Sequence, residues 1–302
     1  MLVVRYRKIF LSLLGLLVLI SIGLIATLGL KQGIDFTGGS YLELSYKSAR
    51  PTVAEIEAKL APLAIEHSPL QPEGDHGVIL RARTLTESEH TEVLTALGAL
   101  PQNDAVHEEQ YSSIGPSIGA ELKSKATWGI ILVILLIILY IAFAFRKVGK
   151  IVPGWLYGVI TIVTLLHDIL IPAGVFALLG HFYGAEIDAL FVTALLAILG
   201  YSISDTIVVF DRIRENLSHA SPREQENNFA EIVGKSLRET VVRSINTSLT
   251  VIIVTVTLVI VGSAATRYFA LTLAIGAFAG SYSSILLASP LLVVLQHVRK
   301  KK

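Results

Sequence analysis

The chain has 302 residues, of which 53% are hydrophobic and 16% are charged, with a formal net charge of +1 and no cysteine. This composition is too apolar for a soluble protein of this length and predicts a polytopic membrane protein. The balanced charge indicates no concentrated basic domain for nucleic acid, and the lack of cysteine excludes disulfides and thiolate metal sites.

Six stretches are long enough to cross a hydrocarbon core of roughly 30 Å, which takes about 20 helical residues. They are residues 9–30, 127–145, 153–179, 189–210, 244–262 and 268–295. The first has a longer apolar core than a secretory signal and lacks a small-x-small cleavage site. We therefore expect it to stay attached as a membrane anchor.

Lysine and arginine gather on one side of the membrane when the chain alternates sides six times. That side holds both termini and the segments 5–8, 146–150, 211–243 and 299–302. The loops on the other side, at 181–186 and 263–267, carry only Arg267. Because short cytoplasmic loops are enriched in positive charge, we expect both termini to be cytoplasmic, in a cell (inner) membrane.

Residues 31–126 have a mixed composition and predict a folded external domain between a first helix at 1–30 and five helices at 127–302. The expected strands are 41–46, 77–83 and 105–113, and the expected helices are 51–63 and 86–97. This order fits a βαββαβ (ferredoxin-like) α+β domain or a close variant. It contains no nucleophile–base–acid arrangement, so we interpret it as a binding or lever domain.

Two glycine-rich segments frame this domain. GIDFTGGS at 33–40 follows the first span, and SIGPSIGAELKSKA at 113–126 precedes the second. Glycine permits tight turns and close backbone approach, while the missing Gly-Lys-Ser/Thr ending argues against a nucleotide phosphate loop. The segments are either plain turns or hinges, and the candidate hinge or motif residues are Asp35, Gly38, Gly39, Gly115 and Gly119.

Asp168 is the first of two carboxylates inside predicted spans, where ionisable groups usually face protein or water and often mark ion routes. It follows His167 and lies four residues before Pro172. A kinked helix would expose both side chains to a polar interior. Alternatively, they form hydrogen bonds that only steady helix packing, and the residues alone leave both interpretations open.

Asp205 is the second carboxylate, with Thr206 among its polar neighbours in the fourth span. Arg243 stands at the start of the fifth span, and Thr247 lies just inside it. Since consecutive spans run in opposite directions at about 1.5 Å per residue, we expect compatible depths for these groups. Movement of Arg243 would then switch the proton affinity of Asp205. The alternative is a permanent Asp205–Arg243 pair that only locks two helices together.

The predicted cytoplasmic connector at 211–243 contains a helix start at Ser221–Glu224, which has an N-cap, a proline at the first position and a capping-box glutamate. An apolar stripe at helical spacing follows over residues 229–241. It suits packing against the membrane, against a partner, or under the chain's own helices. In the last span, Gly276 and Gly280 predict close helix approach.

These motifs occur together in one order: GIDFTGG, GPSIGAEL, the HD pair, GYSISDTIVVFDRIREN and RSINTSLT. Over nearly the whole chain, the series closely resembles the SecF branch of the SecD/SecF family of protein-export membrane proteins, which are related to the resistance-nodulation-division transporters. The resemblance implies six helices with an external domain between the first two. It also implies action with SecD beside the SecYEG channel, with YajC and YidC as further candidate partners, to move unfolded exported polypeptide with the proton motive force.

By this resemblance the family's intramembrane aspartate corresponds to Asp205 and its arginine to Arg243. The resemblance implies that both residues take part in proton coupling. Asp168 matches the family's third-helix HD pair, and Asp211 lies in the matching DRIREN ending. Here the fourth helix has ISDT where many relatives have INDT, so Ser204 replaces an amide neighbour of the aspartate.

Two other functional classes share some of these features. Half of a proton-driven small-solute exporter would share the helices and would differ by a drug-sized pocket in the external domain. An intramembrane aspartyl protease would need Asp168 and Asp205 to share a proton, but helix arithmetic separates their depths by ~15 Å. The patterns Gly-x-Gly-Asp, Gly-x-Ser-x-Gly and His-Glu-x-x-His are missing from the sequence. We therefore expect no enzyme activity, no cofactor and no metal.

Overall fold

The computed structural model describes residues 2–98, 106–146 and 152–300. The chain forms two compact units: a helical unit before Gln32 and after Thr127, and an α+β unit, Gln32–Thr127. Ala105, expected to begin a strand, and the basic residues Lys147 and Lys150 lie outside the described residues.

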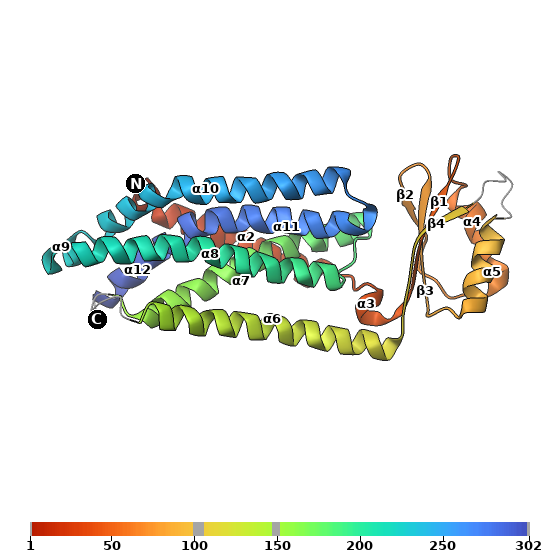
Figure 1. Ribbon diagram of the computed structural model, residues 1–302, viewed down its shortest axis with the longest axis horizontal. Coiled ribbons are helices and arrows are strands. Elements are labelled where there is room, and N and C mark those ends of the chain that lie inside the picture. The colour runs from red at the N-terminus through yellow and green to blue at the C-terminus, as the bar shows by residue number, and fades with distance from the viewer. Residues whose placement is uncertain (1, 99–105, 147–151, 301–302) are drawn as a thin grey trace. The chain divides into compact units, whose positions relative to one another are not determined.

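Six helices in the described chain are long and apolar enough to cross a membrane, which confirms the six predicted spans. They are α2 (Arg7–Leu28), α6 (Pro116–Ala144), α7 (Gly154–Tyr183), α8 (Ala189–His219), α10 (Phe229–Val261) and a last helix built from α11 (Ala264–Ser283), the π-helix η2 (Ser284–Ala288) and α12 (Ser289–Lys300). The short helix α1 (Leu2–Arg5) comes first, and α9 (Pro222–Asn227) joins α8 to α10. The helix α1, the last turns of α12 and the helix α9 lie at the same end of the helical unit (Figure 1). We call this the terminal end.

The segment expected to be a connector at 211–243 is mostly helix. The predicted helix start is confirmed, since Ser221 and Glu224 form a capping box around the first turn of α9. The apolar stripe lies in the core, where Phe229, Val233 and Leu237 are buried. The sequence leaves three surfaces open for this stripe: the membrane, a partner and the chain's own helices. The third is the one observed, because α10 runs alongside α8 here.

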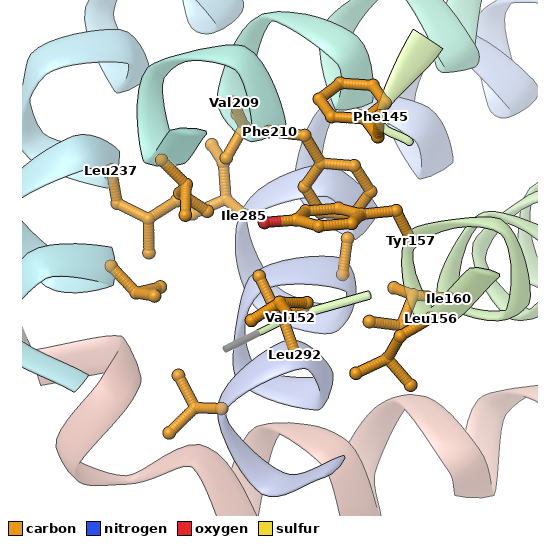
Figure 2. Packing of buried hydrophobic residues seen from close by; sticks show 14 of the residues in the cluster. Phe145, Val152, Leu156, Tyr157, Ile160, Val209, Phe210, Leu237, Ile285 and Leu292 are labelled. Atoms are coloured by element: carbon orange, nitrogen blue, oxygen red, sulfur yellow. The ribbon is translucent and has the colours of Figure 1, made fainter. Parts of the chain in front are cut away.

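An aromatic cluster fills the core near the terminal end. The ring of Tyr157 stacks on Phe145 with centroids 5.0 Å apart and meets the edge of Phe210 at 4.9 Å. Figure 2 shows these rings among the aliphatic side chains of α7, α8, α10 and η2. Such interlocking rings fix the spacing of the helices around them.

Glycines bring α11 close to α8, as the small-xxx-small pattern predicts. A Cβ atom added at Gly276 would lie 2.1 Å from Ile198 Cδ1, and one at Gly280 would lie 3.1 Å from Ser202 Cβ. The missing side chains thus allow the two helices to approach where Ser202 is buried.

The α+β unit has four antiparallel strands in the order β2-β3-β1-β4. The strands are β1 (Gly39–Tyr46), β2 (Gln71–Glu73), β3 (Gly77–Ala82) and β4 (Val106–Ile114). The helices are α3 (Ile34–Thr37), α4 (Val53–Leu60) with the 3-10 turn η1 (Ala61–Leu63), and α5 (Glu87–Gly98). The βαββαβ order is confirmed, and it includes one short strand, β2, that the sequence did not reveal.

One face of this sheet packs against α4 and α5 (Figure 1). Alternate residues of β1, including Leu42 and Leu44, are fully buried against Ile56 and Val93 of the two helices. The expected helix at 86–97 is confirmed, and a capping box starts α5: Thr86 N and Oγ1 both donate to Glu89 Oε2, and Glu89 N donates back to Thr86 Oγ1.

Candidate functional site

Asp205 lies in α8 with 6% of its surface exposed, and its carboxylate faces α10. Ser248 Oγ lies 3.4 Å from Asp205 Oδ2 and 2.8 Å from the carbonyl oxygen of Ser244. Tyr201 donates a hydrogen bond of 2.7 Å to the same Ser248 Oγ. Since a hydroxyl has one proton, Ser248 donates either to Asp205 or to its own helix.

Ser244 is the other buried polar residue on this face of α10. Its hydroxyl lies close to the Asp205 carboxylate but makes no hydrogen bond within the described chain. Ser244 and Ser248 are four residues apart, so they lie one above the other on the helix face that meets α8. Asp205 therefore sits among neutral hydroxyl groups.

Arg243 and Thr247 do not join this group. Both are exposed on α10, and Thr247 Oγ1 donates to the carbonyl oxygen of Arg243 at 3.0 Å. No ion pair within 4.0 Å links Arg243 to Asp205 in the ranges that the structure describes, so the permanent pair considered above is not formed. Arg243 and Thr247 each lie one residue before a buried serine. Because consecutive positions of a helix are rotated by about 100°, their side chains point in a different direction from those of the two serines.

Thr206, the remaining residue proposed around Asp205, is buried in α8. Its hydroxyl donates to the carbonyl oxygen of Ser202, 3.2 Å away, one turn earlier in the same helix. The hydrogen bond of the Thr206 hydroxyl therefore stays within α8, and Ser248 of α10 contacts the Asp205 carboxylate. The signal that identifies Ser248 is its spacing with Ser244, since buried residues of α10 repeat at this interval.

Asp168 forms a second buried polar cluster, with contributions from three helices. Its side chain is fully buried and accepts hydrogen bonds from Ser202 of α8 and, at 2.9 Å, from Ser283 of α11. His167 Nδ1 lies 2.8 Å from Asp168 Oδ1, and Tyr282 OH lies 3.4 Å from His167 Nε2. Both oxygens of the carboxylate are thus held by hydrogen-bonding groups.

Pro172 adds one more polar atom to this region. It lies within the continuous helix α7, four residues after Asp168. Proline has no backbone N–H, so the carbonyl oxygen of Asp168 lacks its usual helical donor. The helix continues through Pro172, and the serines that donate to the Asp168 carboxylate come from the neighbouring helices α8 and α11.

The two carboxylates lie at similar depths. Asp168 is bound by Ser202, and Ser202 precedes Asp205 by three residues, a rise of about 4.5 Å along the helix. The separation of ~15 Å expected above is wrong, because α8 continues to His219, beyond the predicted end of the fourth span at residue 210. No hydrogen bond between the two carboxylates is formed among the described residues.

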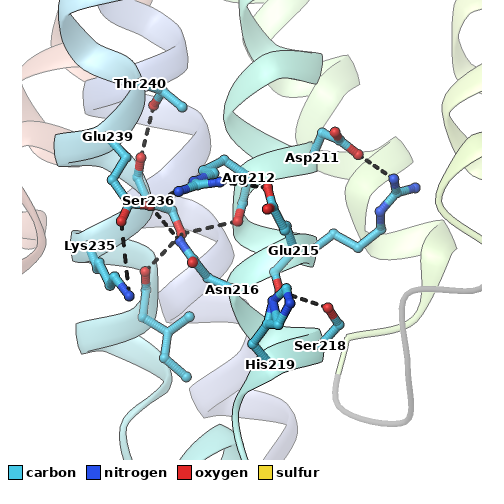
Figure 3. Close-up of polar contacts among 12 residues, drawn as sticks. Asp211, Arg212, Glu215, Asn216, Ser218, His219, Lys235, Ser236, Glu239 and Thr240 are labelled. Carbon is cyan, nitrogen blue, oxygen red and sulfur yellow. Dashed lines mark hydrogen bonds and ion pairs between the residues drawn. The ribbon is translucent and has the colours of Figure 1, made fainter.

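A charged network joins α8 to α10 closer to the terminal end (Figure 3). Arg212 Nε donates to Glu239 at 2.7 Å, and its Nη1 donates to Glu215 at 2.7 Å. Asp211 pairs instead with Arg214 on the exposed side of α8, at 2.5 Å. The DRIREN segment thus holds two helix extensions together, and Asp211 does not face Asp205.

The glycine-rich segments of the α+β unit meet in a packed junction. Gly38 and Gly39 have φ values of 76° and 132°, which favour glycine. A Cβ atom on Gly38 would lie 2.7 Å from Pro116 Cα, and one on Gly119 would lie 2.8 Å from Gly38 N. The chain entering the domain and the chain leaving it therefore touch backbone to backbone.

The other two candidates in this region are less constrained. A Cβ atom on Gly115 would meet nothing within 4 Å, so packing does not explain that glycine. Asp35 is half-buried in the first turn of α3, close to the junction in sequence. Across the described residues, no group of three or more histidine, aspartate or glutamate side chains is arranged to hold a metal ion.

Comparison with known proteins agrees with these features. Residues 96–298 match the family "Protein export membrane protein SecD/SecF, C-terminal", and residues 23–49 match "SecD/SecF GG Motif". The chain is 39% identical to protein translocase subunit SecF of Thermobaculum terrenum, over 96% of this chain and 92% of that protein. It is 34% identical to SecF of Anaerolinea thermophila, over 95% and 92%.

A solved structure is also similar. The crystal structure of SecDF, a translocon-associated membrane protein from Thermus thermophilus, superposes with a TM-score of 0.82 at 30% identity. The match covers 97% of this chain but only 38% of the SecDF chain, so this chain corresponds to one part of that larger protein.

Proposed function

Because this chain belongs to the SecD/SecF family of protein export membrane proteins, we propose that it acts as a SecF subunit that uses proton movement to promote polypeptide translocation across the membrane. The observation that carries the proton role is the environment of Asp205. This carboxylate is buried in a membrane helix and bound by a neutral hydroxyl, Ser248. It can therefore gain or lose a proton without breaking an ion pair.

Ser248 supplies the link from charge to movement. When Asp205 is ionised, the Ser248 hydroxyl donates to the carboxylate and ties α10 to α8. When Asp205 is protonated, the same hydroxyl turns to the carbonyl oxygen of Ser244, 2.8 Å away. One charge crossing 100 mV gains about 2.3 kcal/mol, which biases a two-state movement roughly fiftyfold if coupling is complete.

Arg243 and Thr247 act from the outer face of α10 in this proposal. An arginine and a threonine exposed on a membrane helix are costly against lipid, so this face meets a protein partner, SecD. A shift of α10 in that interface brings the Arg243 charge toward Asp205 or away from it. Asp168 serves as a second protonatable group. SecYEG, with YajC and YidC, forms the surrounding machinery.

The α+β unit acts as the part that engages the exported polypeptide, on the side opposite the termini. Both termini lie in the cytoplasm in this arrangement, in keeping with the lysines and arginines at the terminal end. The packed glycine junction at Gly38, Gly39 and Gly119 passes force from the membrane helices to the sheet. The chain contributes movement and no hydrolytic chemistry of its own.

The test is Asp205→Asn, which keeps the size of the side chain and its hydrogen bonding but cannot titrate. Asp211→Asn is the matched control, because it makes the same change on the exposed side of the same helix. Both variants are purified with SecD and SecYEG and reconstituted in vesicles. Export of a secretory precursor is then measured with and without a proton gradient.

We expect Asp205→Asn to assemble normally and to lose the stimulation of export by the gradient, while Asp211→Asn retains it. Full stimulation in normally assembled Asp205→Asn would remove Asp205 as the proton carrier. A drug-exporter role would instead give gradient-driven efflux of small solutes from the same vesicles without any effect on precursor export.

A further inference from the structure

One face of α7 carries a line of buried polar side chains that the proton role of Asp205 does not use. Tyr157, Thr161, Thr164 and Asp168 follow one another at intervals of four, three and four residues, and each is at most 1% exposed. Helical spacing places them on one face, over a length of about 16 Å. The line begins near the terminal end and finishes at the Asp168 cluster.

Three hydroxyls in this region lack the hydrogen bonds that buried groups normally have. Tyr157 and Thr161, and also Ser284 in η2, have no hydrogen-bond partner among the described residues. Thr164 donates to carbonyl oxygens of its own helix. Leaving a buried hydroxyl unpaired is unfavourable, and native structures seldom do so, which indicates that these three groups bind a partner.

Tyr157 and Thr161 share the face of α7 that carries Asp168, and Ser284 is a buried residue of η2, which packs against α7. In Figure 2 the Tyr157 hydroxyl points toward Ile285, the second residue of η2. Ser284 directly follows Ser283, which donates to Asp168. The π-helix itself is significant, because such widened turns are rare and occur often at functional sites.

The spacing suits water. The hydroxyls of Thr161 and Thr164 are attached directly to Cβ atoms, and helical spacing places these Cβ atoms about 5–6 Å apart. Two hydrogen bonds of about 2.7–2.8 Å through one water oxygen cover this distance. Buried water molecules are held where two to four polar groups converge, and hydroxyls with the Asp168 carbonyl and carboxylate oxygens supply such groups.

We infer that the interface between α7 and η2 binds a file of internal water molecules that runs from Tyr157 past Thr161 to Asp168. The ligand is water, and the binding groups are the hydroxyls of Tyr157, Thr161 and Ser284 together with the oxygens of Asp168. This inference deepens the proposed proton coupling, since a hydrated carboxylate can exchange its proton. The water file itself does not depend on that function.

The aromatic cluster closes the file at the terminal end. Phe145 and Phe210 lie against the ring of Tyr157, and the Arg214 guanidinium lies 5.8 Å from the centroid of Phe145. Water entering from this end must pass these rings.

Radiolytic hydroxyl-radical footprinting tests the inference, because radicals formed from bound water modify the side chains beside it. It is performed on the full-length protein in detergent with mass-spectrometric readout. We expect Tyr157 to be labelled although it is fully buried, and Phe176, an equally buried aromatic outside the line, to stay unlabelled. Equal absence of labelling at both residues would overturn the inference.

Variants of Thr161 give a second readout, the thermal midpoint, which should change in opposite directions for a water file and for a dry interface. Thr161→Val removes the hydroxyl at nearly constant size, Thr161→Ser retains it, and Thr272→Val is the control at a buried threonine whose hydroxyl binds its own helix. With a water file, Thr161→Val reduces the labelling of Tyr157 and lowers the thermal midpoint, while Thr161→Ser restores both.

In a dry interface, Thr161→Val would instead remove an unpaired hydroxyl and raise the thermal midpoint, with no change in labelling. That result would refute the water file. If Thr161→Val does not fold, Ser284→Ala makes the same comparison from η2. None of these measurements involves export. A negative result for the water file therefore does not affect the proposed role of Asp205, and a negative result in the export test of Asp205→Asn does not affect the water file.

Discussion

Ser202 of α8 donates a hydrogen bond to the buried carboxylate of Asp168 on α7. The same serine lies three residues before Asp205, and its carbonyl oxygen accepts a hydrogen bond from Thr206. One turn of α8 therefore touches both candidate proton-binding groups. Any movement of this turn when Asp205 changes its charge would alter the hydrogen bonds of Asp168.

Ser202→Ala tests this connection. It removes one donor from a fully buried carboxylate, so we expect the free energy of unfolding to fall by about 1–3 kcal/mol. Ser218→Ala is the control on the same helix, because Ser218 is exposed and binds only the carbonyl oxygen of Glu215. Thermal unfolding of the purified proteins in detergent measures the difference. Equal midpoints for the two variants would contradict the connection.

Gly276→Ala tests the close approach of α11 to α8. The added methyl group meets the side chain of Ile198, and overpacking of this kind costs about 1–3 kcal/mol. Gly129→Ala on α6 is the control, since a Cβ atom there meets nothing within 4 Å. We expect a lower thermal midpoint for Gly276→Ala and an unchanged or higher one for Gly129→Ala. A similar midpoint for both would show that Ile198 moves aside at little cost.

Glu89 makes the α+β unit sensitive to acid. Hydrogen bonds from Arg83 and from the backbone of Thr86 lower the pKa of Glu89 from 4.5 to about 2. A lowered pKa means that the ionised carboxylate stabilises the folded state above pH 4.5, and that this contribution is lost as the pH falls toward about 2. This contribution is measured by hydrogen exchange of the α5 amides in wild type and Glu89→Gln, compared at each pH.

We expect Glu89→Gln to weaken the protection of α5 at neutral pH, and the difference from wild type to shrink as the pH approaches about 2. Glu57→Gln, at an exposed position of α4, should leave the protection of α5 unchanged throughout. A difference between wild type and Glu89→Gln that stays constant down to the lowest pH would show that the ionised carboxylate is not the stabilising group.

Single cysteines test the membrane orientation, and the absence of native cysteine makes the labelling specific. Asp75→Cys lies at the exposed turn between β2 and β3, and Asn227→Cys lies at the exposed end of α9. We expect a membrane-impermeant maleimide added to spheroplasts to label the first and to label the second only after lysis. Labelling of both from the same side would overturn the six-span arrangement.

A photoreactive amino acid at Thr247 tests the proposed partner face of α10. Thr247 lies exposed beside Arg243, and polar groups at such a position are stabilised by protein rather than lipid. We expect crosslinks to SecD from Thr247. The control is Leu136 on α6, an exposed apolar side chain that suits lipid. Crosslinks from Leu136 and none from Thr247 would place the partner against a different helix.

The amino-acid sequence by itself determined the features that depend on local patterns. Six spans follow from the length of the apolar segments, the βαββαβ order from alternating and helical periodicity, and the capping box of α9 from Ser221 and Glu224, three residues apart. Asp168 and Asp205 were identifiable because a carboxylate within an apolar segment is costly unless it has partners. Strand β2 escaped prediction, since three residues that include Pro72 carry almost no strand signal.

Only the tertiary structure decided which polar groups meet. Residues 243–250 of α10 carry polar side chains on several faces, so hydropathy does not reveal that Ser248, rather than Arg243 or Thr247, points to Asp205. The contact of Ser283 with Asp168 joins residues more than a hundred positions apart and depends on how α11 packs against α7. Rotation of each helix about its axis is set by how whole surfaces interlock, and no short segment of sequence contains that information.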